Sequence, residues 1–109
     1  MRDIIQEYFS AINEQDWDEA KSYCIYGSDI YYETCDLEDY IYDLNFQYGA
    51  VTITLDIDIF DISIYDIYYA QAYIDGTLNI SYDSTSNDSD ENGYIYLQRI
   101  NNSWKIYDY

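Results

Sequence analysis

The spacing of apolar residues changes at Gly49, and this change constrains the fold more than any other feature of the sequence. Before Gly49 the apolar residues recur every three or four positions, which is the spacing of an amphipathic helix. After it they alternate with polar residues, as in a strand with one buried face. Helices followed by strands predict an α+β fold, with the N-terminal helices packed on one face of a curved antiparallel sheet. The other face of the sheet is then expected to be polar.

Three helices are predicted before Gly49. The first covers residues 3–13, and the second begins at Asp16, whose side chain can cap it with Glu19 as the capping-box partner. After a looser stretch, a third helix is expected to be capped by Asp36. Apolar residues at helical spacing would form the inward faces, and they are Ile4, Ile5, Tyr8, Phe9 and Ile12, then Trp17, Ala20 and Tyr23, then Leu37, Tyr40, Ile41 and Leu44.

The second half predicts an antiparallel meander. Residues 51–59 alternate cleanly, and the parity then slips near Phe60–Asp61, which indicates a β-bulge. In the next strand, 68–82, the even positions from Tyr68 to Tyr82 are expected to face inward. Residues 84–93 are predicted to form a polar loop, followed by strands over 94–100 and 104–109 that a short turn joins.

The length of 109 residues and the lack of internal repeats predict a single domain over 1–109. No apolar run approaches the roughly 20 residues of a membrane helix, and no signal peptide is visible, which favours a cytoplasmic location. An exported protein whose signal had been removed stays open as the alternative. The spacing of Cys24 and Cys35 fits no zinc or redox motif. Free thiols are therefore expected, with a disulfide open in the exported case.

Charge is the strongest functional signal. The chain has 22 Asp+Glu against 4 Lys+Arg, a formal net charge of -18. Such a surface repels nucleic acid and anionic lipid, so direct binding to either is not expected. It attracts basic protein surfaces and speeds encounter with them. The predicted partner is therefore a basic protein surface, such as that of a nucleic-acid-binding protein.

Three regions resemble the nuclear transport factor 2-like superfamily, the cystatin-like cone found in small bacterial and phage domains. They cover nearly the whole chain, and they are 4–20, the 68–82 strand with its small Ala70 and Ala72, and the closing segments 96–99 and 103–106. The resemblance implies a curved sheet wrapped around a helix. The superfamily includes ketosteroid isomerase, scytalone dehydratase, transport adaptors and domains of unknown role, so the resemblance implies a fold and not an activity.

An enzyme is not predicted. The chain has no histidine, and an isomerase-like site would need a buried Asp base and a Tyr donor in one cavity. Tyr68 and Tyr82 have the parity to line such a cavity. The strand acids Asp56, Asp58 and Asp75 have the opposite parity, so no catalytic residue is assigned.

One segment matches the opening of a calcium-binding loop. Residues 88–93 read D-x-D-x-N-G, which places Asp88, Asp90 and Asn92 as oxygen ligands. The twelfth position is Arg99 in place of the bidentate Glu, so only a weak calcium site is expected. The alternative is a solvated hairpin loop, and no other cofactor is predicted.

The last candidate is an acidic strand face. Asp56 and Asp58 are two residues apart on a strand, so their carboxylates form a row on one side. Neighbouring strands would add further acids and tyrosines to this partner-binding face, namely Asp75, Tyr69, Tyr73, Tyr94 and Tyr96. Rows of acids can imitate a phosphate backbone, and tyrosines can stack on arginine and aromatic groups. A solvated face and a homodimer interface are the alternatives.

These patterns favour a non-enzymatic acidic binding protein. Its most specific version is a nucleic-acid mimic that inhibits a DNA- or RNA-binding enzyme, such as a phage- or mobile-element-encoded inhibitor of host defence. The first alternative is an extracytoplasmic structural or ligand-sensing domain of a bacterial surface protein or lipoprotein. An isomerase-like enzyme is the third possibility.

Overall fold

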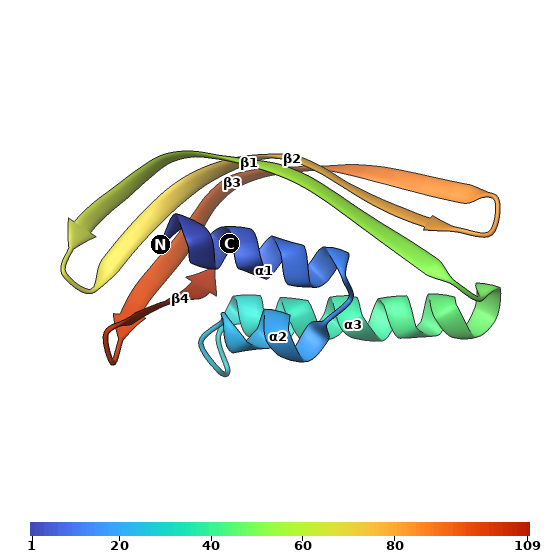
Figure 1. Ribbon diagram of the computed structural model, residues 1–109, viewed down its shortest axis with the longest axis horizontal. Helices are drawn as coiled ribbons and strands as arrows, with labels where there is room; N and C mark the ends of the chain where they lie inside the picture. Colours follow the sequence, from blue (N-terminus) through green and yellow to red (C-terminus); the bar gives the residue numbers. More distant parts are fainter.

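The computed structural model describes all 109 residues and has three helices followed by four strands. The elements are α1 (Arg2–Asn13), α2 (Trp17–Ser22), α3 (Asp29–Tyr48), β1 (Val51–Asp66), β2 (Tyr69–Tyr82), β3 (Thr85–Ile100) and β4 (Ser103–Asp108). The strands form one antiparallel sheet in the order β1-β2-β3-β4. The sheet bends over α1, and α2 and α3 form a further layer below it (Figure 1). The predicted α+β class is confirmed.

The first two helices follow the sequence pattern. Ile5, Tyr8 and Ile12 of α1 are buried, as their spacing predicts. The carboxylate of Asp16 accepts a hydrogen bond from the Glu19 backbone N–H at 3.2 Å, so the predicted Asp16 cap of α2 is confirmed. The reciprocal capping-box bond is not formed, because the Glu19 carboxylate accepts from the Tyr23 hydroxyl and the Asp16 N–H donates to the Ala11 carbonyl oxygen.

The start of α3 was predicted wrongly. Asp36 lies inside the helix, and the N-cap is Ser28, whose hydroxyl accepts a hydrogen bond from the Tyr31 N–H at 3.3 Å. Tyr40 was expected to face inward but is 49 % exposed. Thr34 is buried instead, because its hydroxyl donates to the Ile30 carbonyl oxygen and is thus satisfied inside the protein. A search for apolar spacing misses such a residue.

The alternation in β1 and the bulge that follows it are confirmed. Val51 and Ile53 are buried, while Asp56 and Asp58 are exposed. The pairing register with β2 shifts between Phe60 and Ser63. Where Gly76 of β2 pairs with Ile57 of β1, the two strands approach closely, and a Cβ at Gly76 would lie 2.0 Å from the Asp56 carbonyl oxygen. Only glycine fits there without moving the backbone.

The predicted loop over residues 84–93 is wrong, because these residues belong largely to β3. A tight turn at Asp83–Ser84 joins β2 to β3, and the strands pair from Tyr82↔Thr85 onward. Backbone hydrogen bonds to β2 hold this polar segment extended, although Asp, Asn, Ser and Gly are uncommon in strands. This end of the hairpin extends beyond the end of α1 (Figure 1). Tyr68 lies in the turn before β2 and is exposed, not inward-facing.

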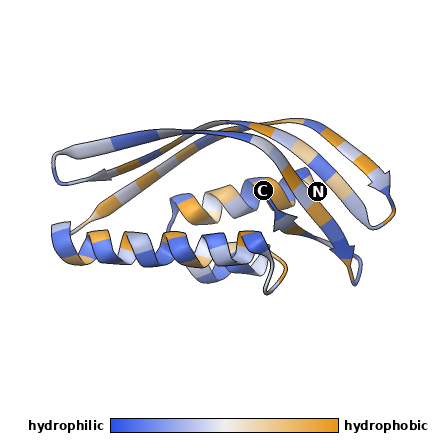
Figure 2. Cartoon of the chain, turned by 180° about the vertical axis from the view of Figure 1, so that it is seen from behind, coloured by the Kyte–Doolittle hydropathy of each residue, from blue (hydrophilic) through white to orange (hydrophobic).

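The core lies between the helices and the concave face of the sheet. Alternate residues of the strands face α1, and Ala72, Ile74, Ile95, Leu97 and Ile106 are fully buried there. Figure 2 shows the resulting alternation of apolar and polar residues along the strands. The opposite, convex face has no helix over it (Figure 1).

Side chains from the helices cover the free edge of β1. Asn13 both donates to the Leu55 carbonyl oxygen, at 3.2 Å, and accepts from the Leu55 N–H. On one side of Leu55, the Val51 N–H donates to the Asn45 side chain and the Val51 carbonyl oxygen accepts from Gln15. On the other side, Arg2 donates to the Ile59 carbonyl oxygen. These contacts occupy groups that would otherwise be free to pair with another strand.

The outer edge of β4 is covered by the main chain. Ile106 exchanges backbone hydrogen bonds with the segment after α2, through Tyr23 and Ile25, at 2.9 and 2.8 Å. Cys24 in this segment is buried, Cys35 is partly buried, and neither forms a disulfide. Burial raises the pKa of the Cys24 thiol to about 11, which keeps it protonated and unreactive. None of the helices is long and apolar enough to cross a lipid bilayer.

Candidate binding face and cavity

The convex face of the sheet carries every residue of the predicted acidic face. Asp58 pairs in register with Asp75, and Tyr73 lies between Phe60 and Tyr94. Asp56, Tyr69 and Tyr96 share this face by the same alternation. The strands therefore bring the predicted residues together on one face.

The face also includes residues that the sequence analysis did not place there. Asp88 lies opposite Asn79, and Asp90 opposite Thr77, because residues 85–93 are a strand. The signal was present in the sequence, since Asp88 and Asp90 are two positions apart like Asp56 and Asp58. Their composition suggested a loop, and only pairing with β2 overrides it.

Two adjoining patches can be defined on this face. The aspartate patch consists of Asp56, Asp58, Asp75, Asp88 and Asp90, all exposed. The aromatic patch consists of Phe60, Tyr65, Tyr69, Tyr73, Tyr94, Tyr96 and Tyr107. They meet where Asp58 and Asp75 lie two residues from Phe60 and Tyr73 along the same strands.

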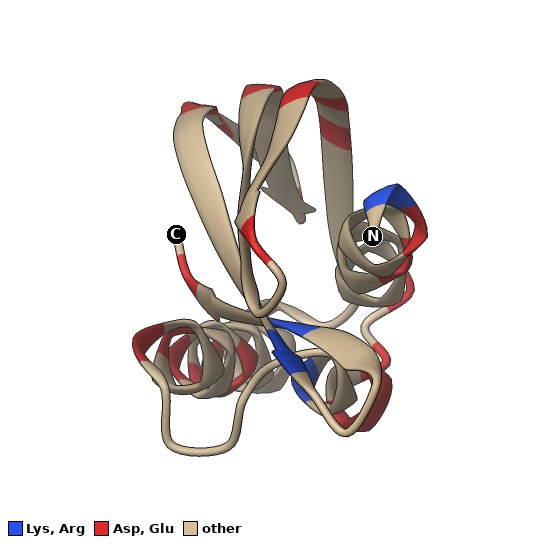
Figure 3. Cartoon of the chain, turned by 90° about the vertical axis from the view of Figure 1, so that its left-hand side faces the viewer, with Lys and Arg blue, Asp and Glu red and all other residues tan.

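The aspartate patch has no compensating positive charge. The one ion pair in the structure joins Lys21 and Glu38, on the helices. The Arg2, Arg99 and Lys105 side chains donate instead to Ile59, Asn102 and Ser22. Figure 3 shows basic residues at the start of α1 and near the β3–β4 turn, and acidic residues distributed along the helices and strands. Asp58 and Asp75 face each other directly, an arrangement that destabilises a sheet.

The aromatic patch is a continuous chain of rings across all four strands. Neighbouring ring centroids are separated by 5.4 Å for Tyr73–Tyr94 and by up to 6.4 Å for Tyr65–Tyr69. Phe60, Tyr65 and Tyr94 are 45 %, 56 % and 46 % exposed. Burial, followed by the neighbouring Tyr65 hydroxyl, raises the pKa of Tyr107 to about 12, so this ring is neutral at physiological pH. Contiguous exposed aromatic surface of this kind is typical of interaction sites.

The calcium prediction depended on a loop that is not formed. Asp88, Asp90 and Asn92 lie along one face of the extended β3 strand. A calcium loop must instead curl so that alternate oxygens surround one ion. No group of three His, Cys, Asp or Glu residues is arranged to hold a metal ion.

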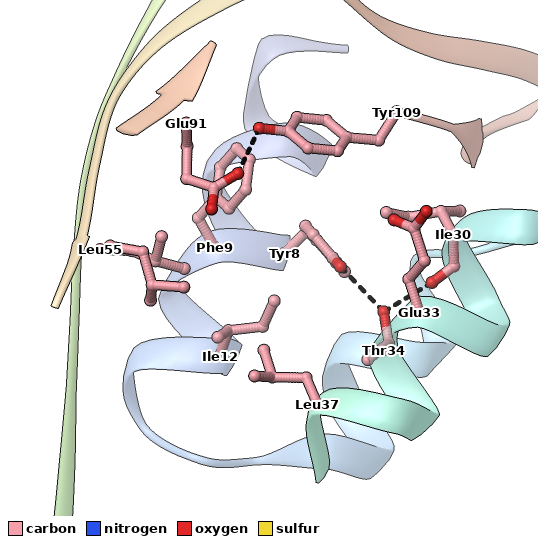
Figure 4. A pocket seen from close by; sticks show the side chains of 11 residues that line it. Tyr8, Phe9, Ile12, Ile30, Glu33, Thr34, Leu37, Leu55, Glu91 and Tyr109 are labelled. Atoms are coloured by element: carbon pink, nitrogen blue, oxygen red, sulfur yellow. Dashed lines mark hydrogen bonds between the residues drawn. The ribbon is translucent and has the colours of Figure 1, made fainter. Parts of the chain in front are cut away.

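A cavity of about 220 Å³ lies between α1, α3 and the concave face of the sheet (Figure 4). Its walls are mainly apolar, with Ile12, Leu37 and Leu55 among them. The polar groups around it come from α1, α3, β3 and the end of the chain, and they are Tyr8, Glu33, Thr34, Glu91 and Tyr109. Sequence patterns did not indicate this set, because its members are far apart in the chain and follow no motif.

The polar groups of the cavity form two hydrogen-bonded pairs. The Tyr8 and Thr34 hydroxyls are 2.8 Å apart, and the Tyr109 hydroxyl donates to Glu91 at 2.7 Å (Figure 4). Burial raises the pKa of Tyr8, and burial with the Glu91 hydrogen bond raises that of Tyr109. Partial burial, reinforced by the nearby carboxylates, also raises the pKa of Glu33. The cavity therefore combines neutral phenols with carboxylates.

The two tyrosines predicted to line one cavity do not share one. Tyr68 precedes β2 and lines a separate surface hollow with Ile67 and Arg99, while Tyr82 ends β2, and neither contributes to the wall of the cavity between α1 and α3. Tyr82 stacks on Tyr48 of α3, with 4.7 Å between the ring centroids. Their shared parity was visible in the sequence, but parity does not say that two residues are close together along the strand.

The sequence matches no protein-family model and no curated protein. Function therefore rests on the geometry of the convex face and of the cavity.

Proposed function

We propose that the protein is a non-enzymatic acidic binding protein whose convex sheet face engages a basic surface of another protein. The observation that carries this proposal is the adjoining position of the aspartate and aromatic patches on one uncovered face. Opposite charge draws the partner in and orients it, while desolvated aromatic contacts supply most of the affinity. The scaffold beneath the patches is a hydrogen-bonded sheet, so little conformational entropy is lost on binding.

The most specific version of this proposal is a nucleic-acid mimic. Same-side carboxylates on one strand are separated by about 6.8 Å, and adjacent strands by about 4.8 Å. Five aspartates thus form a two-dimensional array of negative charge with a spacing of a few ångströms, comparable in density to that of phosphates. The partner would be a DNA- or RNA-binding enzyme, which the protein inhibits by occupying its basic groove, as an inhibitor of host defence would do.

The proposal includes the nuclear transport factor 2-like cone as the fold. The sequence resemblance and the bending of the sheet over α1 support it (Figure 1).

The test is affinity capture from cells of the source organism, with elution by a salt gradient and competition by nucleic acid. A patch variant carries Asp→Asn at all five aspartates of the aspartate patch. A control variant carries Asp→Asn at five exposed acids of the helices, Asp3, Asp18, Asp36, Asp39 and Asp43, and so has the same net charge. We expect the patch variant to lose a nucleic-acid-binding partner that the control variant retains, and nucleic acid to displace that partner. Equal loss in both variants, or retention by the patch variant, would contradict the proposal.

A second candidate function is favoured by the cavity. An apolar space with Glu33 and Glu91 beside it suits a small organic cation with an apolar body, such as an aromatic amine, as in a ligand-sensing domain. Its volume of about 220 Å³ is below that of most drug-sized sites, and no Asp lies in its wall to act as the base of an isomerase-like enzyme. Amide NMR shifts at Thr34, Leu55 and Leu78 on adding small aromatic amines would support this role. No shift at millimolar ligand would argue against it.

A further inference from the structure

Backbone groups along both outer edges of the sheet are already hydrogen-bonded within the chain. The free edge of β1 is hydrogen-bonded to the side chains of Asn13, Gln15, Asn45 and Arg2. The outer edge of β4 is hydrogen-bonded to the backbone of the segment after α2. A partner therefore cannot readily join the middle of the sheet as an extra strand. Recognition has to use the side chains that project from the convex face.

The junction of the two patches places rings and carboxylates side by side. Phe60 and Tyr73 face each other across β1 and β2 at a centroid distance of 6.3 Å. One step along each strand, Asp58 and Asp75 also face each other, about 6.8 Å away. Neither carboxylate forms an ion pair, and the Lys105 ammonium donates to the Ser22 carbonyl oxygen instead. A group that binds here meets aromatic faces and two unpaired carboxylates together.

A second copy of this chain does not fit that surface. Stacking two convex faces would bring two aspartate patches together, each without a compensating cation, and each copy has a net charge of -18. Like-charge contacts of this kind oppose association. The occupant that complements the surface carries positive charge.

Among positive groups, arginine matches both halves of the junction. Its planar guanidinium stacks on aromatic rings and donates two parallel hydrogen bonds to a carboxylate. The lysine ammonium is a strongly hydrated point charge with no planar face to stack. We infer that the aromatic patch binds an arginine-rich segment of the partner protein, with guanidinium groups stacked on Tyr73 and Tyr94 and paired with Asp58 and Asp75. This inference rests on the proposed function and adds that arginine is the basic side chain which the face recognises.

The test compares two fluorescent peptides of equal length and charge, one with arginine and one with lysine at every basic position. Binding to the complete chain is followed by fluorescence anisotropy at fixed ionic strength. We expect the arginine peptide to bind roughly tenfold more tightly, as two cation–π contacts would provide. The variant Tyr73→Leu/Tyr94→Leu should lose that preference, and Tyr73→Phe/Tyr94→Phe, which keeps both rings, should retain it.

The outcomes separate this inference from the proposed function. Equal affinity for the two peptides, with both still weakened by Asp58→Asn/Asp75→Asn, overturns arginine recognition and leaves a general basic partner. No binding of either peptide overturns both. A native dimer in sedimentation velocity that Tyr73→Leu/Tyr94→Leu converts to monomer also overturns the inference, since the patch would then be a self-interface. If the leucine variant is unfolded by circular dichroism, Tyr94→Leu alone replaces it, because Tyr94 is nearly half exposed.

Discussion

The two faces of the sheet are built from the same strands and differ in almost every physical respect. In β2, Ala70, Ala72 and Ile74 face the helices and are fully buried. Their immediate neighbours Tyr73 and Asp75 face outward, and on that side the rings pack against one another and the acids lack cations. The concave face lowers the free energy of the fold through burial. The convex face keeps exposed aromatic surface and like charge without cations, which is the combination expected of a surface used for recognition.

The largest expected difference between the faces comes from truncating one buried side chain. Ile74→Ala should lower the free energy of unfolding by about 3 kcal/mol, because Ile74 is fully buried and the sheet and helices cannot collapse into the space. Thr77→Ala, on the exposed side of the same strand, should cost less than about 1 kcal/mol. Urea unfolding followed by circular dichroism measures both. Similar values for the two variants would mean that the convex face also contributes to the core.

The next largest effect on stability should come from the free edge of β1, where Asn13 is hydrogen-bonded to the backbone. Asn13→Ala removes both side-chain hydrogen bonds to the Leu55 backbone and should cost about 1–2 kcal/mol. It also exposes part of the β1 edge, so self-association should increase. Urea unfolding and analytical ultracentrifugation provide the readouts. The control is Asn87→Ala, since Asn87 is exposed on β3 and its side chain makes no hydrogen bond in the structure.

The concave face should also show a titration at alkaline pH. Burial raises the folded-state pKa of Tyr8 above its unfolded value of 10.0. The stability that protonated Tyr8 contributes is therefore fully present below about pH 10 and is lost as the pH rises above it. Tyr8→Phe should cost about 1 kcal/mol at neutral pH and should weaken the decline in stability above about pH 10.

Unfolding curves at several pH values measure this effect. At neutral pH the exposed Tyr32→Phe should leave stability unchanged, as a control for loss of a hydroxyl. If the alkaline decline is as steep in Tyr8→Phe as in the unsubstituted protein, other tyrosines account for it.

The smallest effect should have the opposite sign. Asp75→Asn removes one of two like charges that face each other across β1 and β2, and should raise the free energy of unfolding by about 0.5 kcal/mol. The reverse change Asn92→Asp adds a third acid in register with Asp75 and should lower it by a similar amount. Both differences should shrink in high salt because these groups are exposed. A loss of stability in Asp75→Asn would show that the aspartate patch is structural.

Local patterns in the sequence were sufficient for several elements. The stripe of α1, the Asp16 cap, the alternation in β1 and the bulge near Phe60 could all be read directly, because each is set by neighbours within a few residues. The parity of the strands also placed Asp56, Asp58 and Asp75 on one side. Local patterns failed where composition opposed the tertiary structure, as in residues 84–93, which pair with β2 despite their polarity.

The candidate sites differ in the same way. Most of the acidic face could be predicted, because a period of two fixes the side on which a residue lies. The cavity could not, since Tyr8, Glu33, Glu91 and Tyr109 meet only after α1 and α3 pack on the sheet.

The amino-acid sequence alone determined the charge of this protein, the order of its helices and strands, and the side on which most strand residues lie, because these depend on residue type and local spacing. The tertiary structure alone decided how far the β2–β3 hairpin extends, which polar groups meet in the cavity, and which tyrosines join into one patch. Those features depend on strand register and helix packing, which are set by contacts between residues far apart in the chain.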